Sequence, residues 1–454
     1  MYFCVLIHIK MKQQKDLIKS LILDFQKNLP LKIIPRNLAL PIESGKIISV
    51  CGVRRCGKTF VLYDTINKLL KHKVRAENIL FINFDDERIA FTEKNLDFII
   101  QSYTELFPDI PFKEVFFFFD EIQMAQGWEQ FVRRVYDKYS KNIFISGSNS
   151  KLLATEIATS LRGRTIPFEV FPLSFSEFCL FKDIDTNFYL QKNAAKLKNS
   201  FVEFNKYGGF PEVVLSGFKF YEKILQEYFH IMLYQDMVER YEIKNIAILK
   251  YYISRMLANL SKPTSVNKIY NEIKSAGIKC DKNLLYDYAD MLESIYFLQR
   301  LCKHDSSVLK AELIKEKKAY FIDNGMINAL NYSFTDDFGK QLENTIFLWL
   351  RRQSDFKRDI YFYKGKKECD FILFDRNKPV KLIQSCWSLS DPDTIKREIQ
   401  GLTDAAKNLK CKDLTIVTSE EEDEIKAENF IIKVVPAWKL LLEKERTNTL
   451  SFSH

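Results

Sequence analysis

The sequence lacks the spacings with which cysteine and histidine side chains usually hold a structural zinc ion. Its nine cysteines form no Cys-x-x-Cys pair, and its five histidines form no His-Glu-x-x-His motif. Both absences argue against a structural zinc site. Cysteines scattered in this way are typical of a reducing compartment, so we expect free thiols and a cytoplasmic protein.

The sequence also lacks an apolar run long enough to cross a bilayer. Its opening, MYFCVLIHIKMK, is apolar for about nine residues and then turns basic, whereas a membrane-spanning helix needs about 20. A secretory signal would carry its positive charge first and a small-residue cleavage site afterwards. We therefore expect no membrane partner. We interpret the opening as a first β-strand, or as residues that precede a working start at Met11.

Repeats of fixed period and low-complexity runs are also missing from the 454 residues, which are enough for two or three domains. A hydrophobic content of 46% and a charged content of 28% are those of a globular protein. The net charge of +9 permits a nucleic-acid partner without requiring one. The excess is concentrated in 1–50, with eight Lys and Arg against three acids, and in 351–381, with ten against five.

Between residues 47 and 170, short apolar runs alternate with helical patterns. Four of the runs are continuous and rich in β-branched or aromatic residues: IISVCG, NILFINFDD, VFFFFDE and NIFISGS. Such runs are typical of strands buried on both faces of a parallel sheet, and their alternation with helices indicates right-handed βαβ units. The predicted fold class is α/β, with a fifth strand at TIPFEVFPL.

The rest of the chain divides into further segments by pattern. After a helical stretch with a turn at FNKYGGFPEVV come helices followed by two short strands, YFLQRLC and KKAYFID, which is the pattern of a winged helix. A second, smaller α/β module follows. The predicted organisation is a basic helical segment 1–45, an α/β core 46–173, a helical lid 174–245, a winged helix 246–325, an α/β module 326–440 and a tail 441–454.

The segment GVRRCGKT fits the phosphate-binding loop pattern GxxxxGK[ST], and it lies between a predicted buried strand and a predicted helix. Glycines let backbone N–H groups curl around phosphate oxygens, and the helix N-terminus adds the positive end of its dipole. We expect Lys58 to reach the β- and γ-phosphates of ATP and Thr59 to bind Mg²⁺. The predicted nucleotide-binding residues are Gly52, Val53, Arg54, Arg55, Cys56, Gly57, Lys58, Thr59 and Phe60.

Two acids follow the apolar run VFFFF about 60 residues after this loop, where the carboxyl edge of a parallel sheet would lie. We expect Asp120 to hold the magnesium ion, directly or through water. We expect Glu121 to orient and activate the attacking water. Together with the loop, these two residues predict an ATPase.

Two later groups of polar residues are weaker candidates for the same reaction. In SGSNS, Ser148 or Asn149 would hydrogen-bond to the γ-phosphate or to the attacking water, or form only a polar turn. In SLRGR, Arg162 and Arg164 are candidates for an arginine finger, which acts across an interface between copies of the chain. A basic pair on the surface is the alternative interpretation of these arginines.

Several motifs match, in chain order, those of a known family: GVRRCGKT, FFFFDEIQ, ISGSNSKLL, SLRGR, YGGFPEVV, YQDMVERY, YFIDNG and GKQLENTIFLWL leading to ECDFIL. From about residue 20 onward the chain resembles the bacterial and archaeal P-loop ATPases of the AAA-like, STAND-related group. Their C-terminal region is a winged helix followed by a restriction-endonuclease-like domain. The resemblance implies the strand order 5-1-4-3-2 and a site for ATP with Mg²⁺.

Two segments bear on nucleic acid as a partner. The helix that would enter a DNA groove, 281–298, carries four acids against one lysine, which opposes phosphate attraction and favours a packing or protein-contact role. The basic segment 351–381 is the candidate surface for DNA or RNA, with a solvated charged face as the alternative. Its candidate side chains are Arg351, Arg352, Lys357, Arg358, Lys364, Lys366 and Lys367, with Tyr361, Phe362 and Tyr363 for stacking.

The stretch ECDFILFDRNKPVKLIQSCW has the layout of a restriction-type nuclease centre, which places an acid on one strand and an acid, an apolar residue and a lysine on the next. Asp370 takes the first position, with Glu343 on the preceding helix as a candidate second ligand. Gln384 and Cys386 stand where the other acid and the lysine belong. Because an amide binds a divalent cation poorly, we predict a degenerate PD-(D/E)xK fold without cleavage, used for binding or contact.

The leading hypothesis is an ATP-binding, magnesium-dependent ATPase. In it, the nucleotide state repositions the C-terminal modules, so that the protein works as a switch or motor. One form of this hypothesis has nucleic acid as the substrate. One alternative is an ATP-dependent nuclease of defence or mobile-element type. Another is a non-catalytic interaction protein in which ATP only orders the fold. Glu121 argues against the last alternative, because a structural nucleotide needs no carboxylate that activates water.

Overall fold

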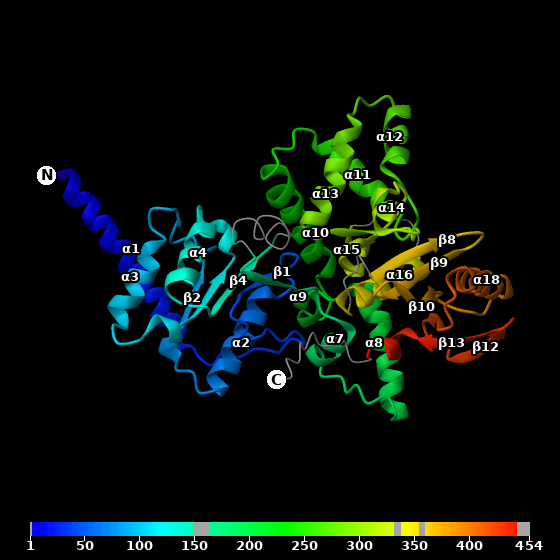
Figure 1. Ribbon diagram of the computed structural model, residues 1–454, viewed down its shortest axis with the longest axis horizontal. Helices are drawn as coiled ribbons and strands as arrows, with labels where there is room; N and C mark the ends of the chain where they lie inside the picture. Colours follow the sequence, from blue (N-terminus) through cyan, green and yellow to red (C-terminus); the bar gives the residue numbers. More distant parts are fainter. Residues whose placement is uncertain (1, 149–160, 162, 331–336, 354–358, 443–454) are drawn as a thin grey trace. The chain divides into compact units, whose positions relative to one another are not determined.

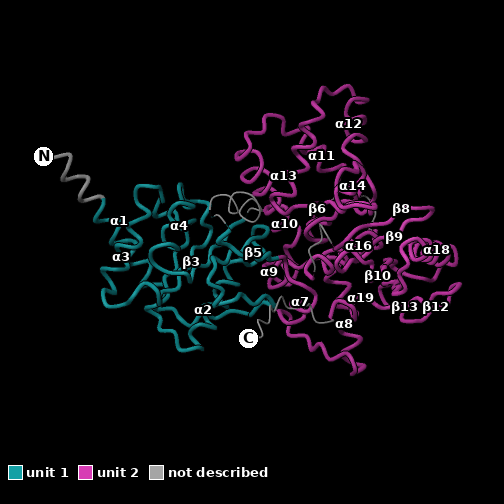
Figure 2. The backbone as a smooth tube through the Cα atoms, viewed as in Figure 1, with its two compact units in different colours: residues 1–170 teal, residues 171–454 magenta. Residues whose placement is uncertain are grey.

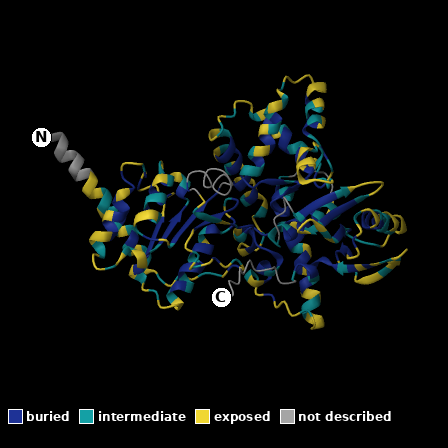
Figure 3. Cartoon of the chain, viewed as in Figure 1, coloured by how far each residue is buried: buried dark blue, intermediate teal, exposed yellow. Residues whose placement is uncertain are grey.

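The computed structural model describes residues 2–148, 161, 163–330, 337–353 and 359–442. The chain divides into two compact units, 1–170 and 171–454, which are teal and magenta in Figure 2. In each unit the buried residues gather along the strands of a large sheet, dark blue in Figure 3. Over the described ranges, we find no helix that is both long and apolar enough to cross a membrane.

The first unit contains a five-stranded sheet in which every neighbouring pair is parallel. Its strands are β1 (Ile47–Cys51), β2 (Ile79–Asn83), β3 (Phe116–Asp120), β4 (Ile143–Gly147) and β5 (Thr165–Glu169). Their spatial order, β2-β3-β4-β1-β5, confirms the order 5-1-4-3-2 that the resemblance implies. Strands β1 and β4 are buried along their whole length, as continuous apolar runs predict.

Helices and short helical turns precede and connect these strands (Figure 1). They are α1 (Tyr2–Lys27), α2 (Lys58–Lys71), η1 (Ala76–Asn78), α3 (Asp97–Leu106), η2 (Phe112–Glu114), η3 (Ile122–Met124) and α4 (Trp128–Lys138). Helix α1 corrects the predicted first strand, because the opening residues continue into one long helix. Ile18 and Ile22, four residues apart on that helix, are both buried, and α1 packs against α3 and β2.

The second unit begins with helices only, as predicted for 174–245. They are α7 (Phe175–Phe181), α8 (Gln191–Tyr207), α9 (Pro211–Leu215), α10 (Tyr221–Ile231) and a π-helical turn η4 (Met232–Glu239). Helix α7 begins at a capping box, in which Ser174 and Glu177 each accept a hydrogen bond from the other's backbone N–H. Helix α9 has Pro211 in its first turn, where a missing N–H has no consequence.

Three helices, two strands and two short helices follow, and we call them the three-helix module. They are α11 (Ile246–Ala258), α12 (Val266–Ser275), α13 (Lys282–Ser294), β6 (Leu298–Cys302), α14 (Val308–Leu313), β7 (Lys317–Phe321) and α15 (Asn324–Ala329). Strands β6 and β7 form an antiparallel pair. Helix α13 ends at Ser294, four residues before the end of the helix predicted over 281–298. Tyr296, just beyond it, adopts a left-handed conformation with a φ of 62°.

The remaining elements form a second α/β part, which we call the sheet module (yellow to red in Figure 1). They are α16 (Phe338–Gln353), β8 (Ile360–Lys364), β9 (Glu368–Asp375), β10 (Lys378–Ser385), α18 (Pro392–Leu409), β11 (Leu414–Thr418), β12 (Asp423–Ala427), β13 (Phe430–Pro436) and α19 (Ala437–Leu440). The sheet order is β12-β13-β11-β10-β9-β8. The pairs β8–β9, β9–β10 and β12–β13 are antiparallel, whereas the pairs β10–β11 and β11–β13 are parallel.

Two backbone connections join the three-helix module to the sheet module within the second unit. Lys303, just after β6, forms an isolated bridge with Phe362 of β8. The backbone N–H of His304 donates to the carbonyl of Phe362 at 2.8 Å. Because main-chain hydrogen bonds hold β6 beside β8, side chains of the neighbouring strand β7 can reach the sheet module.

Candidate functional site

The phosphate-binding loop lies between β1 and α2 and is held in its shape by backbone contacts. Gly52, Arg55 and Gly57 have positive φ angles of 153°, 65° and 100°. A Cβ atom on Gly52 would lie 2.1 Å from the carbonyl oxygen of Val170, so only glycine fits there. The guanidinium of Arg36 donates to the carbonyl of Cys56 at 2.6 Å, which closes the loop from outside the motif.

Lys58, the first residue of α2, is buried beside Glu121. Its ammonium lies 3.4 Å from the Glu121 carboxylate and donates to the carbonyl of Val53 at 3.3 Å. Gln123 donates to the other oxygen of Glu121 at 2.5 Å. Glu121 itself has a φ of 49°, a left-handed conformation that costs a non-glycine residue on the order of 1–3 kcal/mol. The loop lysine and the predicted water-activating acid thus meet in one strained, polar site.

Thr59 and Asp120 also lie together, as predicted for a shared magnesium ion. The hydroxyl of Thr59 donates to Oδ2 of Asp120 at 2.8 Å. The other oxygen of Asp120 accepts a short hydrogen bond from the hydroxyl of Ser146, which also accepts from the backbone N–H of Glu121 at 3.0 Å. Ser146, on β4, therefore holds both acids. The sequence-based prediction took Ser148 and Asn149 from SGSNS and missed Ser146, because Ser146 also belongs to the apolar strand IFISG.

The charges of these groups are set by burial and by one another. Burial alone would lower the pKa of Lys58, but the carboxylate of Glu121 and its other neighbours raise it. Burial would raise the pKa of Glu121, yet Lys58 and Gln123 lower it below the usual value. Burial raises the pKa of Asp120, against the hydrogen bonds from Ser146 and Thr59. At neutral pH the site thus offers a positive ammonium and an ionised Glu121.

The other residues predicted for the nucleotide site differ from one another in exposure and in the contacts that they make. Phe60 is 50% exposed, with its ring edge against Tyr63. Arg164 forms an ion pair with Asp137 at 3.2 Å and lies over the ring of Tyr136, so its guanidinium is engaged inside its own unit. Ser148 is buried at the end of β4. The candidates Asn149 and Arg162 lie outside the described residues.

The acids predicted for the degenerate nuclease site come together in the sheet module, but around a lysine. The ammonium of Lys318, on β7, lies 2.9 Å from Glu343 of α16 and 2.9 Å from Asp370 of β9. It lies 2.8 Å from Glu368, also on β9. The prediction missed Lys318, because a lysine at the start of KKAYFID is what an exposed strand end usually carries.

The two neutral residues of the predicted centre are nearby but play structural roles. Gln384 accepts from the backbone N–H of Asp370 at 3.1 Å and donates to Glu398 of α18 at 2.6 Å. Cys386 is buried, donates to the carbonyl of Ser388, and burial raises its pKa to about 11. An uncharged thiol at this position cannot replace the lysine of an active nuclease.

Two relatives match most of this chain. The uncharacterized protein MJ1544 of Methanocaldococcus jannaschii is 36% identical over an alignment of 450 residues that covers 94% of this chain and 96% of the relative. An uncharacterized protein of Haemophilus influenzae is 31% identical over 330 residues, which are 72% of this chain and 78% of the relative. This chain belongs to their family.

Two regions of this family member match described domains. Residues 44–179 match an AAA domain, and residues 198–337 match a domain of unknown function. Among solved structures, the Walker-type ATPase PABY2304 of Pyrococcus abyssi covers 69% of this chain and 94% of its own, at 14% identity and a TM-score of 0.37. DnaA of Aquifex aeolicus bound to AMPPCP covers 60% and 86%, at 14% identity and a TM-score of 0.23. The AAA-domain match and the parallel sheet give the first unit an AAA-type P-loop ATPase fold.

The prediction of stacking rings in the basic segment 351–381 is wrong for Tyr361 and Phe362. Tyr361 and Phe362 are buried, at 5% and 0% exposure, because they point into the sheet module. The hydroxyl of Tyr363 accepts a hydrogen bond from Asn408. Lys357 and Arg358 lie outside the described residues.

The basic side chains of that segment are also partly engaged. Arg352 donates to the carbonyls of Pro172 and Leu173, and Lys364 forms an ion pair with Glu316 at 3.0 Å. Arg351 donates to Gln299 at 3.2 Å. Lys366 and Lys367 are exposed, in the turn between β8 and β9, and they stay candidates for a phosphate contact.

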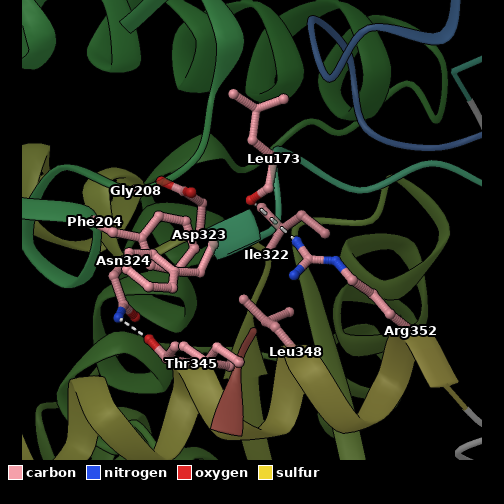
Figure 4. A pocket seen from close by; sticks show the side chains of 11 residues that line it. Leu173, Phe204, Gly208, Ile322, Asp323, Asn324, Thr345, Leu348 and Arg352 are labelled. Atoms are coloured by element: carbon pink, nitrogen blue, oxygen red, sulfur yellow. Dashed lines mark hydrogen bonds between the residues drawn. The ribbon is translucent and has the colours of Figure 1, made fainter. Parts of the chain in front are cut away.

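The family motifs YGGFPEVV and YFIDNG meet around a buried carboxylate, Asp323 (Figure 4). Its two oxygens accept from the backbone N–H groups of Gly209, at 2.7 Å, and Met326, at 3.1 Å. Burial raises the pKa of Asp323 to about 6, against these hydrogen bonds. A Cβ on Gly208 would lie 1.9 Å from Asp323, so glycine is required there. These motifs therefore join α8 to α15 and serve packing rather than chemistry.

Proposed function

We propose that the first unit binds ATP with Mg²⁺ and hydrolyses it. The observation that carries the proposal is the meeting of Lys58, Thr59, Asp120 and Glu121 at the carboxyl ends of β1 and β3, in an AAA-type fold. Ligands of open parallel sheets bind at that edge. An ammonium, a hydroxyl and two acids there have the roles that phosphoryl transfer needs, which are charge neutralisation, metal binding and orientation of water.

Each of these residues has a distinct role in the proposed reaction. Lys58 exchanges its contact with Glu121 for a phosphate oxygen, which leaves Glu121 ionised and free to orient the attacking water. The oxygens of Thr59 and Asp120 are hard ligands 2.8 Å apart, so they fit a magnesium ion. That ion would neutralise the phosphate charge that develops during the reaction. A cation beside Asp120 would also offset the burial of its carboxylate.

Two substitutions separate binding from hydrolysis. Lys58→Ala should abolish ATP binding, because the buried positive charge at the phosphates is lost. Glu121→Gln should bind ATP within about threefold of wild type and lose about 100-fold or more of the turnover, because the amide cannot activate water. Binding is measured with a fluorescent ATP analogue and turnover by phosphate release.

Lys68→Ala is the matched control for the lysine, because Lys68 lies on the same helix and forms only a partly exposed ion pair with Asp64. This variant should bind and turn over ATP like wild type. Turnover like that of wild type in Glu121→Gln would contradict the role of Glu121 and favour a protein in which ATP only orders the fold.

We further propose that ATP turnover controls the second unit, with domain bounds as predicted from the sequence and with DNA or RNA as the partner. The exposed lysines of the β8–β9 turn support this partner, while the buried rings beside them do not. Turnover is measured with and without DNA and RNA. Stimulation by either would support the proposal, and equal rates under all conditions would direct the search to a protein partner.

A further inference from the structure

Lys318 holds a full positive charge inside the second unit, where three carboxylates surround it. Its side chain is 1% exposed, against 12% for Glu343, 7% for Asp370 and 34% for Glu368. Its ammonium donates hydrogen bonds to Glu343 and Asp370, both at 2.9 Å, and forms an ion pair with Glu368 at 2.8 Å. Burial alone would lower the pKa of Lys318, but Asp370 and Glu343 raise it well above the usual value.

The carboxylates around Lys318 are themselves held in place by further donors. The second oxygen of Asp370 accepts from both the backbone N–H and the hydroxyl of Ser385, at 3.0 and 2.9 Å. Tyr320, two residues along β7 on the same face as Lys318, donates to Glu343 at 2.6 Å. Both oxygens of Asp370 are therefore occupied by donors, and one oxygen of Glu343 and one of Glu368 contact the ammonium.

Glu343 and Asp370 are the acids that the sequence predicts for a degenerate nuclease centre, in which they would hold a divalent metal. The described residues do not fit such a metal here, because an ammonium already contacts one oxygen of every acid. A lysine that acted in catalysis would need access to a phosphodiester, and a side chain with 1% exposure has none.

We propose that Lys318 is a built-in cation that takes the position of the divalent metal in this nuclease-like module. The lysine comes from β7 of the three-helix module, whereas its three partners come from α16 and β9. The same contact therefore fastens one module to the other. The sheet module consequently has no metal-dependent cleavage activity. Its role is to pack against the three-helix module.

The test uses the full chain without nucleotide and compares thermal unfolding in EDTA with unfolding in Mn²⁺ or Mg²⁺. Wild type should have the same Tm in all three. Lys318→Met should lower the Tm in EDTA by on the order of 10 °C, because the buried carboxylate of Asp370 and the partly buried carboxylates of Glu343 and Glu368 lose their counter-ion. Mn²⁺ should then restore several degrees, because the uncovered carboxylates form an oxygen site for a hard cation.

Two further variants make the outcome specific. Lys317→Met removes the neighbouring lysine, which points to the other face of β7, and should change neither the Tm nor its response to Mn²⁺. Lys318→Met combined with Asp370→Asn should lose the rescue by Mn²⁺. If Lys318→Met does not fold, two measurements on the wild-type protein still test the proposal. Titration calorimetry with Mn²⁺ should detect no binding, and incubation with plasmid and single-stranded DNA should produce no cleavage.

Three results would overturn the proposal. The first is Mn²⁺ binding by wild type that Asp370→Asn abolishes, which would mean that metal displaces the lysine. The second is DNA cleavage that needs both Lys318 and Asp370, which would make this a working nuclease with a relocated lysine. The third is a Lys318→Met protein as stable in EDTA as wild type. ATP binding by each variant is measured in parallel, so a failure here is distinguishable from a failure of the ATPase.

Discussion

At the scale of single residues, Ser146 links the two acids of the proposed nucleotide site. It is 1% exposed, donates to Asp120 and accepts from the backbone N–H of Glu121. One hydroxyl thus orients the predicted metal ligand and the residue predicted to activate water. Groups that orient metal ligands in this way typically contribute about 10- to 100-fold to metal affinity or activity.

We predict that Ser146→Ala lowers ATP turnover by about 10- to 100-fold while ATP binding changes by about threefold at most. The reason is that Asp120 and Glu121 lose their shared hydrogen-bond partner, whereas Lys58 and the loop backbone are unchanged. The measurement is turnover and nucleotide affinity over a range of Mg²⁺ concentrations, and the Mg²⁺ needed for half-maximal rate should rise.

Ser140→Ala provides the control for this prediction. Ser140 is also buried in the first unit, at 4% exposure, but its hydroxyl donates to the carbonyl of Val115 at 2.8 Å. Its loss should cost about 1 kcal/mol of stability and leave turnover as in wild type. An equal loss of turnover in both variants would mean that Ser146 acts only through the stability of the unit.

At the scale of elements, the contact between α8 and α15 depends on glycines at one end of α8. Gly208 ends that helix with a φ of 76°, and Gly209 donates to the carboxylate of Asp323. A Cβ on Gly325, the second residue of α15, would lie 2.0 Å from the carbonyl of Tyr207. The two helices can therefore approach only where side chains are absent.

We expect Gly208→Ala to destabilise the second unit by about 3 kcal/mol or more. About 1 kcal/mol comes from the positive φ, and the rest comes from the clash with Asp323. Chemical denaturation of the full chain, followed by a probe in the second unit, measures the change. The nucleotide site lies in the other unit, so ATP affinity should be kept.

Gly217→Ala separates the two contributions, because Gly217 has a similar φ of 68° but a Cβ atom added there would have nothing within 4 Å. It should cost only the conformational contribution, about 1 kcal/mol. If both variants cost the same, the contact with Asp323 contributes nothing measurable, and the buried carboxylate would need another explanation.

At the scale of the whole molecule, the open question is whether the net charge of +9 serves a nucleic acid. Much of the basic segment 351–381 is engaged within the second unit, but Lys366 and Lys367 are exposed. A contact between lysine and phosphate releases counter-ions, so each such contact adds to the salt dependence of binding.

We predict that Lys366→Glu combined with Lys367→Glu weakens DNA or RNA binding and flattens the slope of log K against log salt by about 1.8, the value for two phosphate contacts on duplex DNA. Lys426→Glu combined with Lys433→Glu, two exposed lysines of β12 and β13, is the control of equal charge. Equal slopes for the two double variants would mean that net charge alone acts, or that the contact lies elsewhere, for example in 1–50.

The sequence alone predicted the proposed nucleotide site and the strands of the sheet that carries it. The loop, the first turn of α2 and the acids after β3 are each local, because a strand, a tight turn and a helix N-terminus place their residues without help from distant segments. The sheet order followed from family resemblance, and the structure confirms it. The stacking prediction is wrong for Tyr361 and Phe362, because a short run of tyrosine and phenylalanine does not tell which side chains are buried.

Tertiary structure alone decided the two residues that change the chemistry of the sites. Ser146 acts because β4 pairs with β3, and Lys318 acts because β7 lies against a sheet module whose acids come 25 and 52 residues later. A lysine in a sequence carries no sign of burial, since the same side chain is usually solvated at a strand end. Only the fold supplies the three carboxylates that make its burial favourable, because they lie on two elements that pairing and packing bring to one point.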